Sequence, residues 1–198
     1  MNGFPIIFKN TNLVKIESRL LSYLNHHDSD FGMHNKDEDY WKGRVLGVEL
    51  INDEEIQREL TLHGLQIIEA IGKIFPKNPA FSDTLHIVKW PDGLGMPLHA
   101  DGQANDGGHH DYFWRQFGSV TFLNDNFADG FLNLPNQKMR IKPETGKTVI
   151  FPGTSEYLHE VIAARGGIRY TLASFLSFDE THKADHIYEL YEKFSNQT

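Results

Sequence analysis

A histidine and an aspartate stand two residues apart in the segment MPLHADGQ, residues 96–103. Side chains two apart on a strand project from the same face, so His99 and Asp101 could bind one metal ion together. His159, in the segment YLHEVI, follows sixty residues after His99 and offers a third ligand. Two imidazoles and one carboxylate on one side of a metal leave positions open opposite, which suits non-haem Fe(II) and O₂ chemistry.

The same residues also fit a purely structural interpretation. Asp101-Gly102 is favourable turn chemistry, and a histidine near a strand end is usually a polar surface residue. A His-x-Asp pair by itself is a weak signal, because such pairs occur often by chance. The metal interpretation therefore depends on what accompanies the pair, and Arg169 follows His159 at a spacing of ten.

The segment IRYTLASFLSF places Arg169 in one row with Thr171, Ala173 and Phe175 if it forms an extended strand. The opposite row is also mostly apolar or small, so we expect the arginine to be partly buried. Burying an unpaired charge costs on the order of several kcal/mol, and the segment contains no acidic residue. A dicarboxylate ligand would supply the partner, with Thr171 donating a second hydrogen bond; a distant Asp or Glu is the alternative.

Two amphipathic helices are predicted ahead of these residues. The first covers 11–25, and the second begins after Asn52 as N-cap, with Glu55 three residues on, and ends before Pro76. Their apolar positions recur at helical spacing and predict the buried faces: Leu13, Ile16, Leu20 and Leu24 in the first, and Ile56, Leu60, Ile67, Ile71 and Ile74 in the second.

From residue 84 the pattern changes to short apolar or alternating runs separated by Gly, Pro, Asn and Asp, which is typical of an antiparallel sandwich or barrel. We therefore predict an α+β fold in one domain over residues 1–198. Helical support covers about 1–80, a strand-rich core about 84–178, and a C-terminal helix about 180–195. The expected strands are TLHIVKW, MPLHAD, SVTFLND, FLNLP, KMRIKP, KTVIFPG, YLHEVIA and IRYTLASFLSF.

The composition is that of a globular protein, with 39% hydrophobic and 23% charged residues among 198. The formal net charge of −8 argues against a general binder of nucleic acid or of anionic membranes, which needs a basic surface. Because there is no cysteine, thiolate ligands, a cysteine nucleophile and disulfides are excluded. The sequence shows no signal-peptide pattern and no membrane-length apolar run, so we expect a cytoplasmic protein.

The loop GQANDGGHHDYFWRQF, residues 102–117, starts directly after Asp101 and must therefore begin beside any metal. Its glycines permit movement, and Tyr112, Trp114 and Arg115 offer flat apolar area and a charge to a substrate. We interpret the segment as a lid that closes over the substrate, since a mere connection could be shorter. The alternative is that the aromatic residues simply anchor the loop to the core.

With these residues in place, the chain resembles the Fe(II)- and 2-oxoglutarate-dependent dioxygenases, and among them the prolyl 4-hydroxylase-like group. That family carries His-x-Asp, then a distant His, then Arg or Lys about ten residues later. The matching residues are HAD at 99–101, His159 in HEV and Arg169 in GIRYTL. Lesser matches are FLND at 122–125, DGFLNL at 129–134 and IKPETGKTVIFPG at 141–153, so the resemblance covers roughly residues 84–178.

The resemblance implies a double-stranded β-helix, or jelly-roll, core flanked by N-terminal helices. It implies Fe(II) on His99, Asp101 and His159, with 2-oxoglutarate as cosubstrate, O₂ as oxidant and ascorbate as a candidate reductant. The keto acid end of 2-oxoglutarate would bind the iron and its far carboxylate would bind Arg169, beside Thr171. In the family, decarboxylation of 2-oxoglutarate yields succinate and CO₂ while a substrate C–H bond is hydroxylated.

The chain departs from the group where many prolyl hydroxylases carry tyrosines. Trp90, Met96 and Phe122 stand at these approximate positions. The leading hypothesis is hydroxylation of a prolyl residue in a peptide or protein, and the alternative is the same chemistry on a free amino acid or other small molecule. Two further alternatives are a Zn²⁺-dependent hydrolase on the same ligands and a non-catalytic jelly-roll binding protein. Neither of them would need Arg169 to bind a carboxylate.

Overall fold

A computed structural model describes residues 3–32 and 39–196 of the chain. Its three α-helices are Thr11–His26 (α1), Glu54–Ile74 (α2) and Asp185–Ser195 (α3). Helix α1 matches the predicted range, and the four predicted apolar residues are its buried face. It begins where the Asn10 side chain accepts hydrogen bonds from the backbone N–H groups of Asn12 and Leu13, which are left without helical partners at a helix start.

Helix α2 differs from its prediction at both ends. Asp53, and not Asn52, is the N-cap, because its carboxylate accepts from the backbone N–H of Ile56 at 3.1 Å. Asn52 instead donates its backbone N–H to the Tyr23 hydroxyl at 3.0 Å. At the other end Ile74 is 36% exposed, so the predicted buried face stops at Ile71.

The predicted C-terminal helix is two elements: a 3₁₀ turn at Glu180–His182 and then α3. Helix α3 packs against α2 at Gly64, which the sequence leaves in the middle of a helix. A Cβ at that position would stand 2.6 Å from the Tyr191 hydroxyl and 3.2 Å from the Leu85 side chain. The glycine therefore costs helix stability but lets α3 and the sheet approach α2 closely.

The larger sheet of the described residues is antiparallel, with strand order β1-β9-β5-β12-β3-β2. Its long central strands β3 and β12 pair along most of their length, which places Arg169 opposite Trp90 and Thr171 opposite Val88. The bounds are Ile6–Lys9 (β1), Lys147–Pro152 (β9), Phe117–Phe122 (β5), Arg169–Ser177 (β12), Phe81–Trp90 (β3) and Val45–Gly47 (β2).

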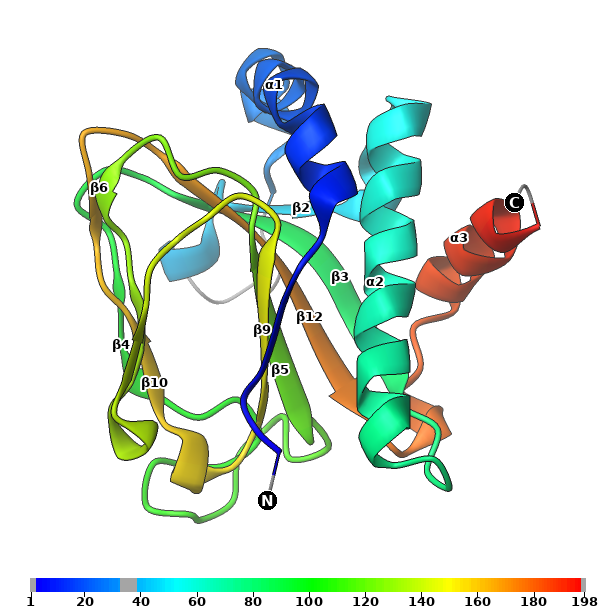
Figure 1. Ribbon diagram of the computed structural model, residues 1–198, viewed down its shortest axis with the longest axis vertical. Coiled ribbons are helices and arrows are strands. Elements are labelled where there is room, and N and C mark those ends of the chain that lie inside the picture. The colour runs from blue at the N-terminus through cyan, green and yellow to red at the C-terminus, as the bar shows by residue number, and fades with distance from the viewer. Residues whose placement is uncertain (1–2, 33–38, 197–198) are drawn as a thin grey trace.

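The smaller sheet has the order β4-β10-β7-β8 and is also antiparallel. Strands β11 and β6 pair in a short ladder, and Figure 1 shows β6 at the upper end of the smaller sheet. The bounds are Met96–His99 (β4), His159–Val161 (β10), Leu132–Leu134 (β7), Met139–Ile141 (β8), Ala164–Arg165 (β11) and Ala128–Asp129 (β6).

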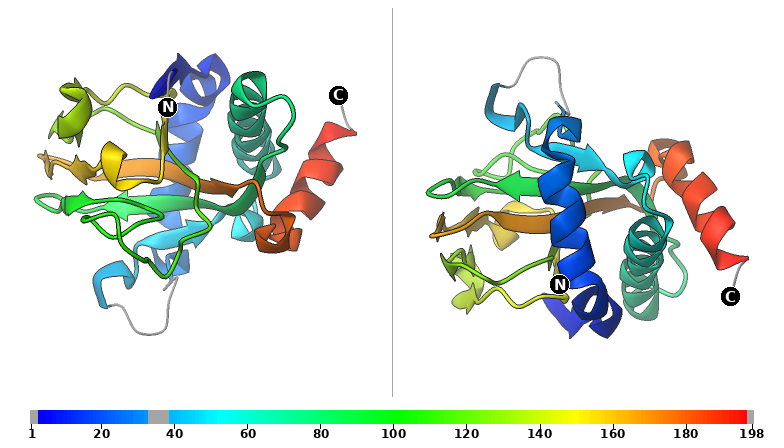
Figure 2. Two further views of the ribbon diagram at one scale, coloured as in Figure 1. Left: turned by 90° about the horizontal axis from the view of Figure 1, so that it is seen from below. Right: turned by 90° about the horizontal axis from the view of Figure 1, so that it is seen from above.

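The elements form three layers: the smaller sheet, the larger sheet, and the helices α1 and α2 with α3 beside them (Figure 1). The views from below and above show that the helices cover only one face of the larger sheet (Figure 2). Strand β12 is buried on both faces, since Tyr170 and Leu172 join the core under the helices while Ala173 joins the core between the sheets. Side chains that alternate along β12 thus serve two different cores.

All eight predicted strands are present, and the α+β jelly-roll prediction for the core is confirmed. Four further strands of the described residues were not predicted. Strands β1 and β2 come from the region predicted as helical support and lie at the edges of the larger sheet, and β6 and β11 pair with each other. Within the described ranges, no helix combines the length and the apolar character that a membrane span requires.

Candidate functional site

The three predicted metal ligands come together where the smaller sheet faces the larger one. His99 is the last residue of β4 and lies directly opposite His159, the first residue of β10, with ring centroids 4.2 Å apart. Asp101 Oδ1 lies 3.7 Å from His99 Nε2 and 3.6 Å from His159 Nε2. One ligand atom from each residue lies within 4.8 Å of the others, a spacing that could hold a metal ion.

Asp101 reaches this position by a different route from the predicted one. Strand β4 ends at His99, and Asp101 lies in the bend that follows, so the two-residue alternation of a strand does not place it. The bend is fixed by a hydrogen bond from the Gly102 N–H to the Gly153 carbonyl at 2.8 Å. Space for the carboxylate comes from Gly118 on β5, where a Cβ would collide with Asp101 Oδ2.

Backbone carbonyls fix the protons of both imidazoles. His99 Nδ1 lies 2.8 Å from the Pro97 carbonyl and His159 Nδ1 lies 3.2 Å from the Tyr157 carbonyl. A carbonyl only accepts, so each Nδ1 carries a hydrogen, and each Nε2, on the side of Asp101, is the nitrogen that would bind a metal ion. Burial lowers the pKa of His159 to about 4, which keeps its imidazole neutral, as metal binding requires.

The carboxylate of Asp101 is only partly satisfied. Asp101 is 8% exposed, and its Oδ2 is buried without a hydrogen-bond partner. Leaving a charged oxygen buried and unpaired is costly unless a cation approaches it. Two imidazole nitrogens and one carboxylate oxygen are a donor set that suits Fe(II), so the residues present fit that metal.

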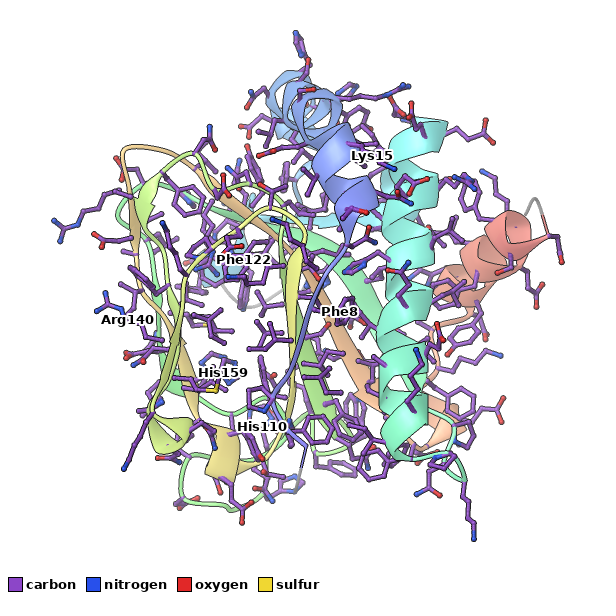
Figure 3. The ribbon with its side chains drawn as sticks, in the orientation of Figure 1. Phe8, Lys15, His110, Phe122, Arg140 and His159 are labelled. Atoms are coloured by element: carbon purple, nitrogen blue, oxygen red, sulfur yellow. The ribbon has the colours of Figure 1, made fainter. Side chains whose placement is uncertain are left out.

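A cavity of about 280 Å³ opens beside these three residues. Its walls come from both sheets and from the loop at 102–117, and Figure 3 shows His159 pointing into the space between the sheets while Arg140 points outward. The lining is mostly apolar: Trp41, Val45, His86, Val88, Trp90, Met96, His99, Ala100, Asp101, His110, Tyr112, Arg115, Ser119, Val120, Leu132, Phe151, His159, Val161, Arg169, Thr171, Ala173 and Phe175.

Arg169 is almost completely buried at the cavity wall, with 1% of its surface exposed. Its Nη1 donates to the Gly130 carbonyl at 2.9 Å, whereas its Nε and Nη2 are buried without a partner. None of the described acidic side chains forms an ion pair with it, so the alternative of a distant Asp or Glu partner is wrong for this part of the chain. Burial lowers the pKa of Arg169 to about 9, which leaves it charged near neutral pH.

The predicted row of Arg169, Thr171, Ala173 and Phe175 lies along the cavity wall. Thr171 Oγ1 accepts a hydrogen bond from Trp90 Nε1 at 3.0 Å. Since a hydroxyl can accept and donate at once, the hydrogen of Thr171 remains for another acceptor. Arg169 and Thr171 together therefore suit the carboxylate end of an anionic ligand.

The loop at 102–117 brings two of its three predicted substrate residues to the cavity. Tyr112 and Arg115 are lining residues. The Arg115 guanidinium carbon lies 4.0 Å from the Tyr112 ring centre and 3.9 Å from that of Phe175, and Arg115 Nε donates to Asp83 Oδ2 at 3.0 Å. The arginine is thus held rigidly at the cavity edge.

Trp114 is not among the lining residues. Its Nε1 donates to Asp83 Oδ2 at 2.8 Å, and its ring stacks on His182 with centroids 4.3 Å apart. It anchors the loop to β3 and to the turn before α3, while the neighbouring Phe113 is 61% exposed. Closure of the loop over a substrate stays a prediction.

The sequence analysis placed Trp90 near a position where related enzymes carry a tyrosine, but it did not single out His86. Both project from β3 into the cavity with Val88 between them, so the two-residue alternation of TLHIVKW carried the signal. Arg44 was also missed, because nothing in a sequence tells which residue will pack behind Trp90.

No protein-family model and no curated protein matches the chain. Among solved structures, a Trichoplax adhaerens prolyl hydroxylase in complex with a hypoxia inducible factor peptide fragment is 17% identical, with a TM-score of 0.66 over 92% of this chain and 86% of that one. The viral collagen prolyl hydroxylase of Paramecium Bursaria Chlorella virus-1, solved as a 2OG complex, is 14% identical, with a TM-score of 0.63 over 89% and 96%.

A Pseudomonas putida prolyl-4-hydroxylase is 17% identical, with a TM-score of 0.63 over 88% of this chain and 93% of that one. These three likenesses span nearly the whole length of each chain at low identity. The resemblance that the motifs predicted is therefore confirmed at the level of architecture: this chain has the fold of the prolyl hydroxylases.

Proposed function

We propose that this protein is an Fe(II)- and 2-oxoglutarate-dependent dioxygenase that hydroxylates a prolyl residue of a peptide or protein. The observation that carries the proposal is the pairing of two unsatisfied groups in one cavity. Asp101 Oδ2 lacks a partner beside two histidines, and Arg169 Nε and Nη2 lack partners on the facing wall. A cation at one place and a carboxylate at the other would satisfy both, and 2-oxoglutarate can bridge them.

In this proposal His99, Asp101 and His159 hold Fe(II), which when bound supplies the redox chemistry that couples O₂ and 2-oxoglutarate to oxidation of a C–H bond. Arg169 binds the far carboxylate of 2-oxoglutarate in a charge-assisted pair, and the Thr171 hydroxyl donates to the same group. The apolar lining excludes water from the reacting atoms. Tyr112 and Arg115 contact the primary substrate at the cavity edge.

A peptide substrate is supported by one of the similar structures, the Trichoplax adhaerens prolyl hydroxylase in complex with a hypoxia inducible factor peptide fragment. The acidic net charge of −8 gives no support to a nucleic-acid substrate. A hydrolase on the same three ligands leaves Arg169 unexplained, because hydrolysis needs no buried guanidinium with free nitrogens.

The test is formation of succinate from 2-oxoglutarate by the purified protein with Fe(II), O₂ and ascorbate. We expect slow uncoupled turnover without substrate and faster turnover with proline-containing peptides that gain one oxygen atom. His99→Ala, Asp101→Ala and His159→Ala should each abolish turnover and leave the fold intact by circular dichroism. Turnover at the wild-type rate in any of these variants would remove that residue from the metal site.

A further inference from the structure

Arg44 lies just before β2, outside the cavity, and only 5% of it is exposed. Its Nε donates to the Lys89 carbonyl at 3.0 Å and its Nη1 donates to the Tyr40 carbonyl at 2.9 Å. Its Nη2 is buried without a partner. A buried guanidinium that is incompletely paired is expensive, and an apolar side chain would fill the same space at lower cost. Packing alone therefore does not explain an arginine here.

The guanidinium of Arg44 is enclosed by aromatic rings that lead to the cavity. Its central carbon lies 4.4 Å from the ring centre of Tyr40, 5.0 Å from that of Trp41 and 4.7 Å from that of Trp90. The corresponding carbon of Arg169 lies 5.0 Å from the same Trp90 ring. Two guanidinium groups thus contact one indole, and planar stacking of this kind restrains the ring.

The orientation of that indole decides what Thr171 can do. The indole N–H can only donate, and it donates to Thr171 Oγ1 at 3.0 Å. A hydroxyl that accepts this bond must direct its own hydrogen elsewhere. Thr171 lies in the cavity row two residues from Arg169, whose Nε and Nη2 are free. The hydroxyl hydrogen and the free guanidinium nitrogens are therefore available to one carboxylate.

We propose that Arg44 is a positioning residue that holds the Trp90 indole so that Thr171 donates to the far carboxylate of 2-oxoglutarate. This inference rests on the proposed function, because it requires 2-oxoglutarate on Arg169. It adds a residue outside the cavity that sets cosubstrate affinity.

The test measures binding without turnover. The Mn(II)-loaded protein is titrated calorimetrically without O₂, first with 2-oxoglutarate and then with 2-oxobutyrate, which lacks the far carboxylate. Arg44→Met should weaken 2-oxoglutarate about tenfold, the usual worth of one hydrogen bond to a charged group, and leave 2-oxobutyrate unchanged. Asp53→Ala, which removes the N-cap of α2 far from the cavity, is the matched control for general loss of stability and should leave both affinities unchanged.

A double-mutant cycle with Thr171→Val distinguishes positioning from a separate contribution. Once the hydroxyl is absent, Arg44→Met should have little further effect, so the two losses should not add. Arg44→Lys keeps the charge but not the planar fork, and we expect it to bind 2-oxoglutarate as weakly as Arg44→Met. It also tests the inference if the methionine variant does not fold.

Additive losses in the cycle, wild-type affinity in Arg44→Met, or full recovery in Arg44→Lys would each overturn the positioning role of Arg44. An equal loss of 2-oxoglutarate and 2-oxobutyrate would overturn it as well, since the effect would then not pass through the far carboxylate. A wild-type protein that binds Mn(II) but no 2-oxoglutarate would instead refute the proposed function on which the inference depends.

Discussion

Gly118 has no side chain and so leaves room for Asp101, the proposed carboxylate ligand of the metal. A Cβ there would collide with Asp101 Oδ2 and stand 3.0 Å from the Phe151 ring. We predict that Gly118→Ala moves the carboxylate and weakens Mn(II) binding at least about tenfold, because one of three ligands is displaced. Gly72→Ala is the control: that site in α2 is open, so the variant should gain up to about 1 kcal/mol in stability and bind Mn(II) normally. Normal Mn(II) affinity in Gly118→Ala would mean that the bend at Asp101 shifts to accommodate the added methyl group without displacing the carboxylate from the metal.

We expect Arg169 to lower the stability of the ligand-free protein and to strengthen binding of 2-oxoglutarate. Its buried charge lacks a described acidic partner, and burial lowers the pKa of the guanidinium to about 9. Arg169→Met should therefore unfold at higher urea concentration than wild type when no ligand is present. The same variant should bind 2-oxoglutarate roughly thirty- to several-thousandfold more weakly, the loss of about 2–5 kcal/mol for a buried charge pair, with Mn(II) affinity unchanged. A variant that is less stable without ligand would point to a partner for Arg169 other than a ligand.

At the scale of elements, the sequence predicted every long strand, because each carries an apolar run bounded by turn residues. It missed the edge strands β1 and β2 and the two-residue strands β6 and β11, which are all too short to show a clear alternation of their own. It also placed Asp101 on a strand that ends at His99. His99 and Asp101 do lie close together, as predicted. What brings them together is the bend at Asp101, which a hydrogen bond from Gly102 to Gly153 holds, and such a long-range contact cannot be read from local spacing.

The loop at 102–117 is tied to the core at both ends. The Gln103 side chain accepts from the Ser155 N–H at 2.9 Å, and Arg115 and Trp114 donate to Asp83. Its middle is exposed, so removing residues 108–111 should leave the anchors in place. We predict that this deletion spares uncoupled succinate formation but lowers coupled hydroxylation of a peptide at least about tenfold, because in the proposed function the loop contacts the primary substrate and not 2-oxoglutarate. Equal loss of both activities would indicate a structural role for the loop.

At the scale of the whole molecule, the contacts that escaped prediction join distant parts of the chain. Arg44 meets Trp90 because β2 and β3 pair, and the pairing register is not visible in either segment alone. His63, on α2, likewise reaches across to the larger sheet, where its Nε2 lies 2.9 Å from the Thr121 hydroxyl and 2.9 Å from the Thr148 hydroxyl. A histidine on an apolar helix face gives no indication of which strands it will contact.

The proton on His63 is fixed by the start of α1. Asn10 Oδ1 caps that helix, so its Nδ2 must point the other way, and it lies 2.9 Å from His63 Nδ1. The amide nitrogen donates, which means that His63 Nδ1 accepts and its hydrogen sits on Nε2, facing the two hydroxyls. Protonating Nδ1 would set it against the Asn10 amide donor and leave Gln66 Oε1, 3.3 Å away, as its acceptor. Helix α1, helix α2 and the larger sheet are thus joined through one neutral imidazole.

This arrangement makes the folded state sensitive to acid. Burial lowers the pKa of His63 from 6.5 to about 4, so between these values the unfolded chain binds a proton that the folded chain does not. Stability should therefore fall as pH falls from about 6.5 towards about 4, by up to about 3 kcal/mol from this residue.

Urea unfolding of the metal-free protein between about pH 7 and about pH 4.5 measures the loss. His63→Asn keeps a polar side chain that does not titrate, and we expect it to start less stable but to lose about 2 to 2.5 kcal/mol less between about pH 7 and about pH 4.5. His159, whose pKa is also lowered to about 4, stays in both proteins and cancels in the difference. Parallel curves for the two proteins would show that His63 is already charged in the fold or that the core admits water around it.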